Sequence, residues 1–72
     1  MEKGKLIELR VGGERRLAVA DRPEGKKDWI VIEASGQSHK IRSQRVEYEI
    51  SGGPYTPKDI PNFLQQVQPY LD

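Results

Sequence analysis

The stretch from Arg16 to Ile32 places the strongest constraint on what this chain can fold into. Two apolar runs, Leu17–Ala20 and Trp29–Ile32, flank a charged segment that contains Pro23 and Gly25. A Pro at the second position of a four-residue turn presets φ, and a Gly at the fourth position completes a type I signature. The stretch therefore predicts a β-hairpin.

The predicted hairpin has a basic tip and an apolar base. Lys26 and Lys27 follow the turn, where they are expected to face water. We expect four apolar residues of the two strands to hold the core together: Leu17, Val19, Trp29 and Val31.

Short apolar runs and turn residues continue along the whole chain. Val46, Tyr48 and Ile50 alternate with carboxylates, which is typical of a strand with one buried face. Gly12–Gly13 and Gly36 mark turns that favour positive φ. The expected strands cover residues 5–11, 15–20, 29–33, 38–42 and 46–50. This spacing predicts a mainly β fold over residues 1–52, a small SH3-like antiparallel barrel of about five strands.

Residues 53–72 are expected to form a linker and one C-terminal α-helix that packs on the barrel. Asp59 is the expected N-cap, because Pro61 then lies in the first turn, where no backbone donor is needed. Thr56 would open a preceding turn, and Pro69 ends the run. An apolar stripe at helical spacing comprises Ile60, Phe63, Leu64 and Val67. A helix that covers its own barrel explains this stripe, and a helix that fills a partner's groove is the alternative.

Size and composition limit the classes of protein that this chain can belong to. Its 72 residues, 35% of them hydrophobic, suffice for one domain with a modest core. The absence of Cys and the single His exclude disulfides, Cys-based zinc sites and multi-His metal sites. No apolar run approaches the roughly 20 residues of a membrane span, and residues 1–4 show no signal-peptide pattern. We expect a monomeric, cytoplasmic domain without membrane contact, cut from a longer chain.

No group of residues predicts a catalytic or metal site in this chain. His39 has no nucleophile-elbow motif around it and is expected at the barrel rim. Glu47 and Glu49 lie on one strand face and are typical of a solvated surface rather than of acid–base chemistry. Gly12–Gly13 lacks the context of a phosphate-binding loop. We therefore expect no catalytic residue and no metal ligand here.

Basic residues gather in the first two thirds of the chain and suggest a polyanion partner. Residues 1–45 hold eleven Lys and Arg against seven Asp and Glu, whereas residues 46–72 hold one against four. The candidate RNA-binding residues are Arg15, Arg16, Arg22, Lys26, Lys27, Lys40, Arg42 and Arg45. Ordinary solubilising charge is the alternative, because Glu14, Glu24 and Asp28 are interleaved with these cations.

Two aromatic residues are candidates for stacking on nucleic-acid bases. They are Trp29 and Tyr48, both within predicted strands. Trp29 opens an apolar strand, so a core role is favoured for it. Tyr55 and Tyr70 lie outside the strands and are more open to surface roles.

Extended segments of the chain resemble one enzyme family. The run from Arg16 to Val31 is similar to the N-terminal region of cyanobacterial and plastid exoribonucleases of the ribonuclease II/R (RNB) family. The segments Lys3–Gly4, Leu6–Leu9, Gln44–Tyr48 and Phe63–Asp72 fit the same family. The resemblance covers nearly the whole chain and includes no catalytic motif.

This resemblance implies an N-terminal accessory domain of a 3′–5′ exoribonuclease. It implies magnesium held by aspartates of a later catalytic domain, so no metal ligand is carried over to this chain. The expected partners are RNA and the downstream domains of the same protein. The alternative is a protein-interaction or intramolecular docking module that does not touch nucleic acid, and a free-standing enzyme is a third, more remote interpretation.

Overall fold

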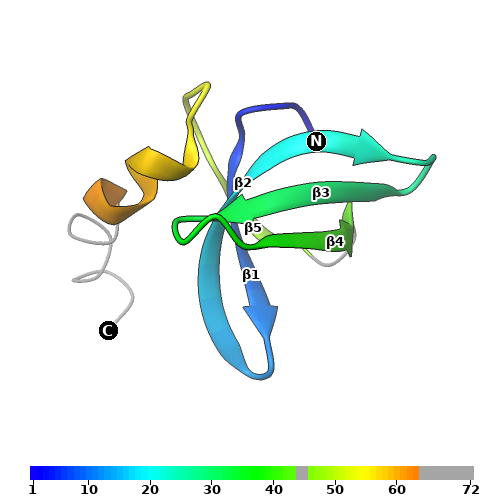
Figure 1. Cartoon of the computed structure of the whole chain (residues 1–72), viewed down its shortest axis with the longest axis horizontal. Helices are drawn as coiled ribbons and strands as arrows, with labels where there is room; N and C mark the ends of the chain where they lie inside the picture. Colours follow the sequence, from blue (N-terminus) through cyan, green and yellow to red (C-terminus); the bar gives the residue numbers. More distant parts are fainter. Residues whose placement is uncertain (44–45, 64–72) are drawn as a thin grey trace.

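Five antiparallel strands form a single sheet in the computed structural model, which describes residues 1–43 and 46–63 (Figure 1). The strands are β1 (Leu6–Val11), β2 (Glu14–Glu24), β3 (Asp28–Glu33), β4 (Ser38–Arg42) and β5 (Val46–Ile50). Their order in the sheet is β4-β3-β2-β1-β5. The predicted mainly β fold with five antiparallel strands is confirmed.

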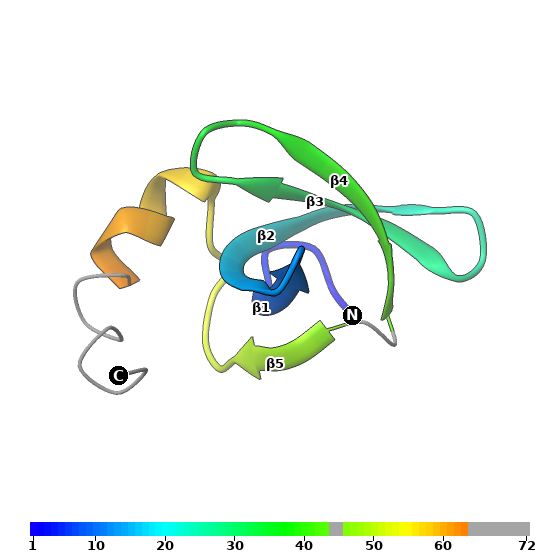
Figure 2. The ribbon, with the colours of Figure 1, turned by 90° about the horizontal axis from the view of Figure 1, so that it is seen from below.

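The sheet curls because its last strand returns to its first. β1 to β4 form a meander in which each strand pairs with the next, and β5 then pairs with the free side of β1. Figure 2 shows β4 and β5 on opposite sides of β1 and β2, so that the sheet wraps around one face. We call this wrapped face the inner face and the opposite one the outer face.

The β2–β3 hairpin is longer than the sequence predicts. β2 runs to Glu24 and β3 begins at Asp28, so the predicted type I turn centred on Pro23 is wrong. Pro23 instead pairs with Trp29 inside the hairpin, and residues 25–27 make the turn, with Gly25 at φ +69°. β1 pairs with β2 only up to Val19, so β2 has a free side near Pro23, as on an edge strand.

Both faces of the sheet carry a hydrophobic cluster. The inner cluster comprises Ile7, Leu9, Ala18, Ala20 and Val31, with Met1, Trp29, Ile41 and Val46 packed against it. The outer cluster comprises Leu6, Leu17, Val19 and Ile60, with Ile50, Tyr55 and Phe63 packed against it. Trp29 and Val31 thus lie in the core as expected. Leu17 and Val19 do not join them, because side chains alternate between faces along β2.

The segment after β5 covers the outer face. Thr56 opens the 3₁₀ turn η2 (Pro57–Asp59), in which the Asp59 carboxylate accepts a 2.8 Å hydrogen bond from the Thr56 backbone N–H. Residues 60–63 are helical and follow η2 directly. The expectation that Asp59 is the N-cap is wrong: Thr56 is the N-cap, and Asp59 lies inside the helical turn, from which its carboxylate reaches back to the Thr56 backbone. Ile60 is buried against the outer cluster. Leu64, Val67 and Pro69 lie outside the described residues. Within residues 1–43 and 46–63, no helix is long and apolar enough to cross a membrane.

Candidate nucleic-acid interface

The structure divides the predicted RNA-binding residues into two sets. Arg15 and Arg16 lie on β2 near the β1–β2 turn, at the same end of the barrel as the pocket described below. Arg45 lies outside the described residues. The other five residues gather around the β2–β3 hairpin and β4; we call this set the distal basic face: Arg22, Lys26, Lys27, Lys40 and Arg42.

Acidic partners engage the two arginines near the β1–β2 turn. Arg15 Nε lies 3.4 Å from Glu8 Oε1. The Arg16 guanidinium lies 3.3 Å from Glu14 Oε2 and 3.4 Å from Glu33 Oε2. These contacts compensate the positive charge, so this end of the barrel is a poor site for phosphate groups.

Strand register brings the distal basic face together. Arg22 and Lys40 both lie opposite Ile30, so the three side chains share the outer face. Arg42 lies opposite Asp28 on that face. A 3.4 Å hydrogen bond from Ser43 N to the backbone oxygen of Lys27 holds the hairpin turn beside the end of β4. Residues distant in sequence therefore form one continuous surface.

Most cations of the distal basic face have no acidic partner. Across the part of the chain that the structure describes, Lys26, Lys27, Lys40 and Arg42 form no ion pair, and all four are exposed. Arg22 contacts Asp21 at 2.6 Å, yet its side chain is 61% exposed. Asp21, Glu24 and Asp28 are the acidic neighbours in the same hairpin, so five positive charges meet three negative ones.

Glu33 is a residue that sequence reasoning missed. It ends β3, and it contacts both Arg16 of β2 and His39 of β4. The hydrogen bond from His39 lowers the pKa of Glu33 below its ordinary 4.5; partial burial opposes this and the charge of Arg16 adds to it. A carboxylate only accepts hydrogen bonds, so His39 Nε2 donates. The short turn between β3 and β4 was the sequence signal that could have predicted the contact of Glu33 with His39. A short turn determines which residues of the two strands lie side by side.

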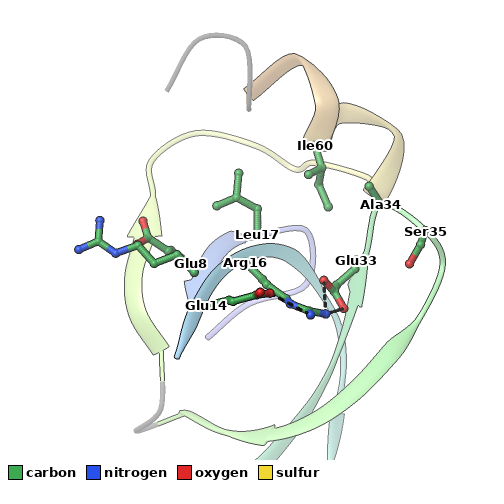
Figure 3. Close-up of a pocket in the computed structure, with 9 residues that line it drawn as sticks. Glu8, Glu14, Arg16, Leu17, Glu33, Ala34, Ser35 and Ile60 are labelled. Carbon is green, nitrogen blue, oxygen red and sulfur yellow. Dashed lines mark hydrogen bonds and ion pairs between the residues drawn. The ribbon is translucent and has the colours of Figure 1, made fainter. Parts of the chain in front are cut away.

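A pocket of about 300 Å³ opens between β2, the β3–β4 turn and the helical segment (Figure 3). Leu17 and Ile60 form its apolar floor. Its charged walls are formed by Glu8, Glu14, Arg15, Arg16 and Glu33. Together the walls carry three carboxylates and two guanidinium groups. Among the described residues no group of three or more His, Asp or Glu is placed to hold a metal ion.

Comparisons with known proteins agree with this architecture. A family model described as the CSD-like barrel domain of RNase II matches residues 1–60. An uncharacterized ribonuclease of Synechocystis sp. is 69% identical over all of this chain, which covers 11% of that protein. Ribonuclease II, chloroplastic/mitochondrial, of Arabidopsis thaliana is 34% identical over all of this chain, which covers 9% of that protein.

The chain thus spans about a tenth of the length of these relatives, and it matches their N-terminal part. No solved structure matches it. Because the family model accounts for residues 1–60 and the five-stranded fold agrees with it, the chain belongs to the RNase II family as a CSD-like barrel domain.

Proposed function

We propose that this chain is the N-terminal accessory domain of a 3′–5′ exoribonuclease and that it assists the enzyme in engaging RNA. The distal basic face is the observation that carries the proposal, because four of its five cations lack an acidic partner among the described residues. Two relatives named as ribonucleases match the chain over its whole length, which supports the parent activity.

In this proposal the domain contributes binding and no chemistry. Exposed Lys and Arg side chains replace the counterions around the phosphates, which yields sequence-independent and salt-dependent affinity. Hydrolysis would take place in a later catalytic domain that holds magnesium, in the cytoplasm. The domain would raise the local concentration of RNA near that site.

Charge reversal at the hairpin turn tests this function. Lys26→Glu with Lys27→Glu is expected to weaken binding of a short single-stranded RNA about tenfold at low salt, and to flatten the salt dependence of the affinity, because two phosphate contacts are lost. Fluorescence anisotropy of a labelled RNA, measured over a series of salt concentrations, gives both quantities.

Two single variants provide a matched control for this experiment. Lys27→Glu and Lys58→Glu make the same change of charge, but Lys58 lies in η2 rather than on the distal basic face. We expect only Lys27→Glu to lower the affinity by more than twofold. Unchanged RNA affinity in the double variant would remove the hairpin turn as a contact site.

A docking module without nucleic-acid contact is the second candidate function. The observation that favours it is the apolar pocket beside the helical segment, because such pockets are typical of sites that receive a side chain of a partner. This candidate predicts that the chain without substitutions has no salt-dependent affinity for RNA.

A further inference from the structure

The aromatic side chains that the structure describes lie away from the distal basic face. Trp29 packs against the inner cluster, and Tyr55 and Phe63 pack against the outer cluster. Tyr48 is exposed, but it lies on β5, which pairs with β1 and not with a strand of the distal basic face. Within residues 1–43 and 46–63, this face therefore offers no ring on which a base can stack.

An isoleucine occupies the centre of the face instead. Ile30 is partly buried and lies between Arg22 of β2 and Lys40 of β4 in the strand register. Its aliphatic side chain has no π-face, so it cannot form the stacking contact on which proteins that bind unpaired strands depend. Affinity for an unpaired strand then comes from phosphate contacts alone.

The cations of this face are spread over an area and do not form a line. Arg22 and Lys40 lie two strands apart, which is about 10 Å at the usual strand spacing. Arg42 lies two residues beyond Lys40, about 7 Å along β4. Lys26 and Lys27 extend the area to the hairpin turn. An unpaired strand carries one row of phosphates, whereas a duplex presents the phosphates of two strands side by side.

Carboxylates within the same face limit its net charge. Glu24 and Asp28 lie opposite each other in the row of residues next to Arg22 and Lys40, and Asp21 contacts Arg22. Five positive and three negative charges leave a net charge of +2. With so small a net charge, the attraction depends on how densely the ligand is charged. A duplex carries one negative charge per about 1.7 Å of its axis, against about 3.4 Å for one of its strands.

We propose that the distal basic face binds base-paired segments of RNA in preference to unpaired ones. Its cations contact phosphates of both strands, and no base is read. Duplex RNA is recognised through its shape and backbone, which requires no aromatic ring. The inference rests on the proposed RNA engagement and names the class of RNA that this face takes.

The position of the face leaves room for a ligand as wide as a duplex. Figure 1 shows the helical segment at the opposite end of the molecule from the tip of the β2–β3 hairpin. The helical segment therefore does not cover the hairpin turn, and the exposed side chains of Lys40 and Arg42 lie beside that turn on β4.

A comparison of paired and unpaired RNA tests the inference. Fluorescence anisotropy of the 72-residue chain with a labelled blunt RNA duplex, and with each of its two unpaired strands, gives the affinities over a series of salt concentrations. We expect the duplex to bind about three- to tenfold more tightly at low salt, because it presents twice as many phosphates per length. For about three phosphate contacts, the slope of log affinity against log salt is expected to be about −2.7 for the duplex and about −2.1 for the strands.

Addition of a ring at the centre of the face tests the physical cause. Ile30→Tyr is expected to raise the affinity for the unpaired strands about fivefold or more, through stacking, and to leave the duplex affinity within about twofold. Ile30→Val adds no ring and is expected to change neither affinity. Tyr is common in strands and Ile30 is only partly buried, so we expect the variant to fold.

Two further variants test whether the duplex lies on this face. Lys40→Gln and Lys58→Gln remove the same charge from an exposed residue, but Lys58 lies in η2 and outside the distal basic face. Only Lys40→Gln is expected to lower the duplex affinity by more than about twofold. Equal effects of the two substitutions would place the duplex elsewhere and overturn the inference.

The results distinguish failure of this inference from failure of the proposed function. Tighter binding of the unpaired strands than of the duplex at the same salt concentration would overturn the inference, while RNA engagement would stand. Absence of salt-dependent binding to either form of RNA would overturn both. A folded Ile30→Tyr variant that binds the unpaired strands no better would also overturn the inference, because the lack of a ring would then not explain the preference.

Discussion

Glu33 connects three strands through its side chain. Its carboxylate accepts a hydrogen bond from His39 and lies 3.4 Å from the Arg16 guanidinium, so β2, β3 and β4 meet at one group. Only 15% of this side chain is exposed, which strengthens both interactions relative to a fully solvated pair. This environment favours the charged form of the carboxylate, which is why the pKa of Glu33 is lowered.

The lowered pKa of Glu33 makes stability depend on pH on the acid side. Because its pKa in the folded state lies below the ordinary 4.5, the carboxylate stabilises the fold at pH above 4.5. This contribution is lost as the pH falls below 4.5 and through the lowered pKa. We expect Glu33→Gln to reduce the free energy of unfolding by about 1 kcal/mol at pH 7 and by much less near pH 3.

Urea unfolding at both pH values measures this difference. Glu24→Gln is the matched control, since Glu24 is exposed, and we expect it to change the stability little at either pH. Equal effects of the two substitutions at pH 7 would contradict a stabilising role for the Glu33 interactions.

At the scale of elements, Gly4 joins the start of the chain to the segment after β5. Its N–H donates to Ala20 at 2.8 Å, and its carbonyl accepts from Tyr55 N–H at 2.7 Å. Its φ is +86°, and a Cβ built there would lie 2.6 Å from Pro54 Cβ. A glycine is therefore needed both for the backbone conformation and for the close approach.

Alanine substitutions at Gly4 and Gly25 should separate these two requirements. Gly25 also has positive φ, at +69°, but nothing lies within 4 Å of a Cβ there. Gly25→Ala is expected to cost about 1 kcal/mol of unfolding free energy, from backbone conformation alone. Gly4→Ala is expected to cost about 2–4 kcal/mol, because overlap with Pro54 is added. Chemical denaturation of both variants checks this, and equal costs would contradict the close approach.

At the scale of the whole molecule, two hydrophobic clusters share one sheet. Neighbouring residues of β1 point into different clusters, Ile7 into the inner one and Leu6 into the outer one. Ala18 and Val19 do the same in β2. Since these strands serve both clusters, neither cluster can lose its packing without disturbing the backbone that supports the other. The domain should therefore unfold as one unit.

Truncation of the Ile60 side chain on the outer face, followed by a probe on the inner face, tests whether the two clusters unfold together. Ile60 is only 2% exposed, so Ile60→Ala leaves a cavity and is expected to cost about 2–5 kcal/mol. Trp29 packs against the inner cluster, so its fluorescence reports on the face opposite Ile60. If the domain unfolds as one unit, the unfolding transition followed by Trp29 fluorescence should shift as much as the transition followed by circular dichroism. If Ile60→Ala does not fold, Ile60→Val replaces it in the experiment. Ile60→Val is expected to lower the free energy of unfolding by only about 0.5–1.5 kcal/mol and to keep the domain folded.

Lys58→Ala, an exposed change in the adjacent η2 turn, is the control for this experiment. In Ile60→Val and Ile60→Ala, the midpoint of unfolding followed by Trp29 fluorescence could stay in place while the midpoint followed by circular dichroism shifts. That result would show that the two clusters unfold separately.

Local sequence patterns accounted for most of the elements. Alternating apolar residues and turn glycines act between close neighbours along the chain, so the five strands could be placed from them. The β2–β3 hairpin was the exception, because Pro23 is accepted in a strand only where one side of that strand is free. Which side is free depends on how far β1 extends, and that is a long-range property.

The candidate interface could be predicted only as a set of residues. Composition indicated the cations, but it could not tell Arg16, held by Glu14 and Glu33, from Lys40, which forms no ion pair among the described residues. Pairing of charges depends on which side chains strand register brings together, and Glu33 with His39 shows the same dependence.

The mainly β class, the strands and the basic character of the hairpin tip follow from local sequence alone, because each depends on residues a few positions apart. Three features required the three-dimensional fold: Leu17 and Val19 turn away from Trp29, Tyr48 lies opposite Glu8, and the cations separate into a set with acidic partners and a set without them among the described residues. These features follow from the curl and register of the sheet, which place residues from distant parts of the chain side by side.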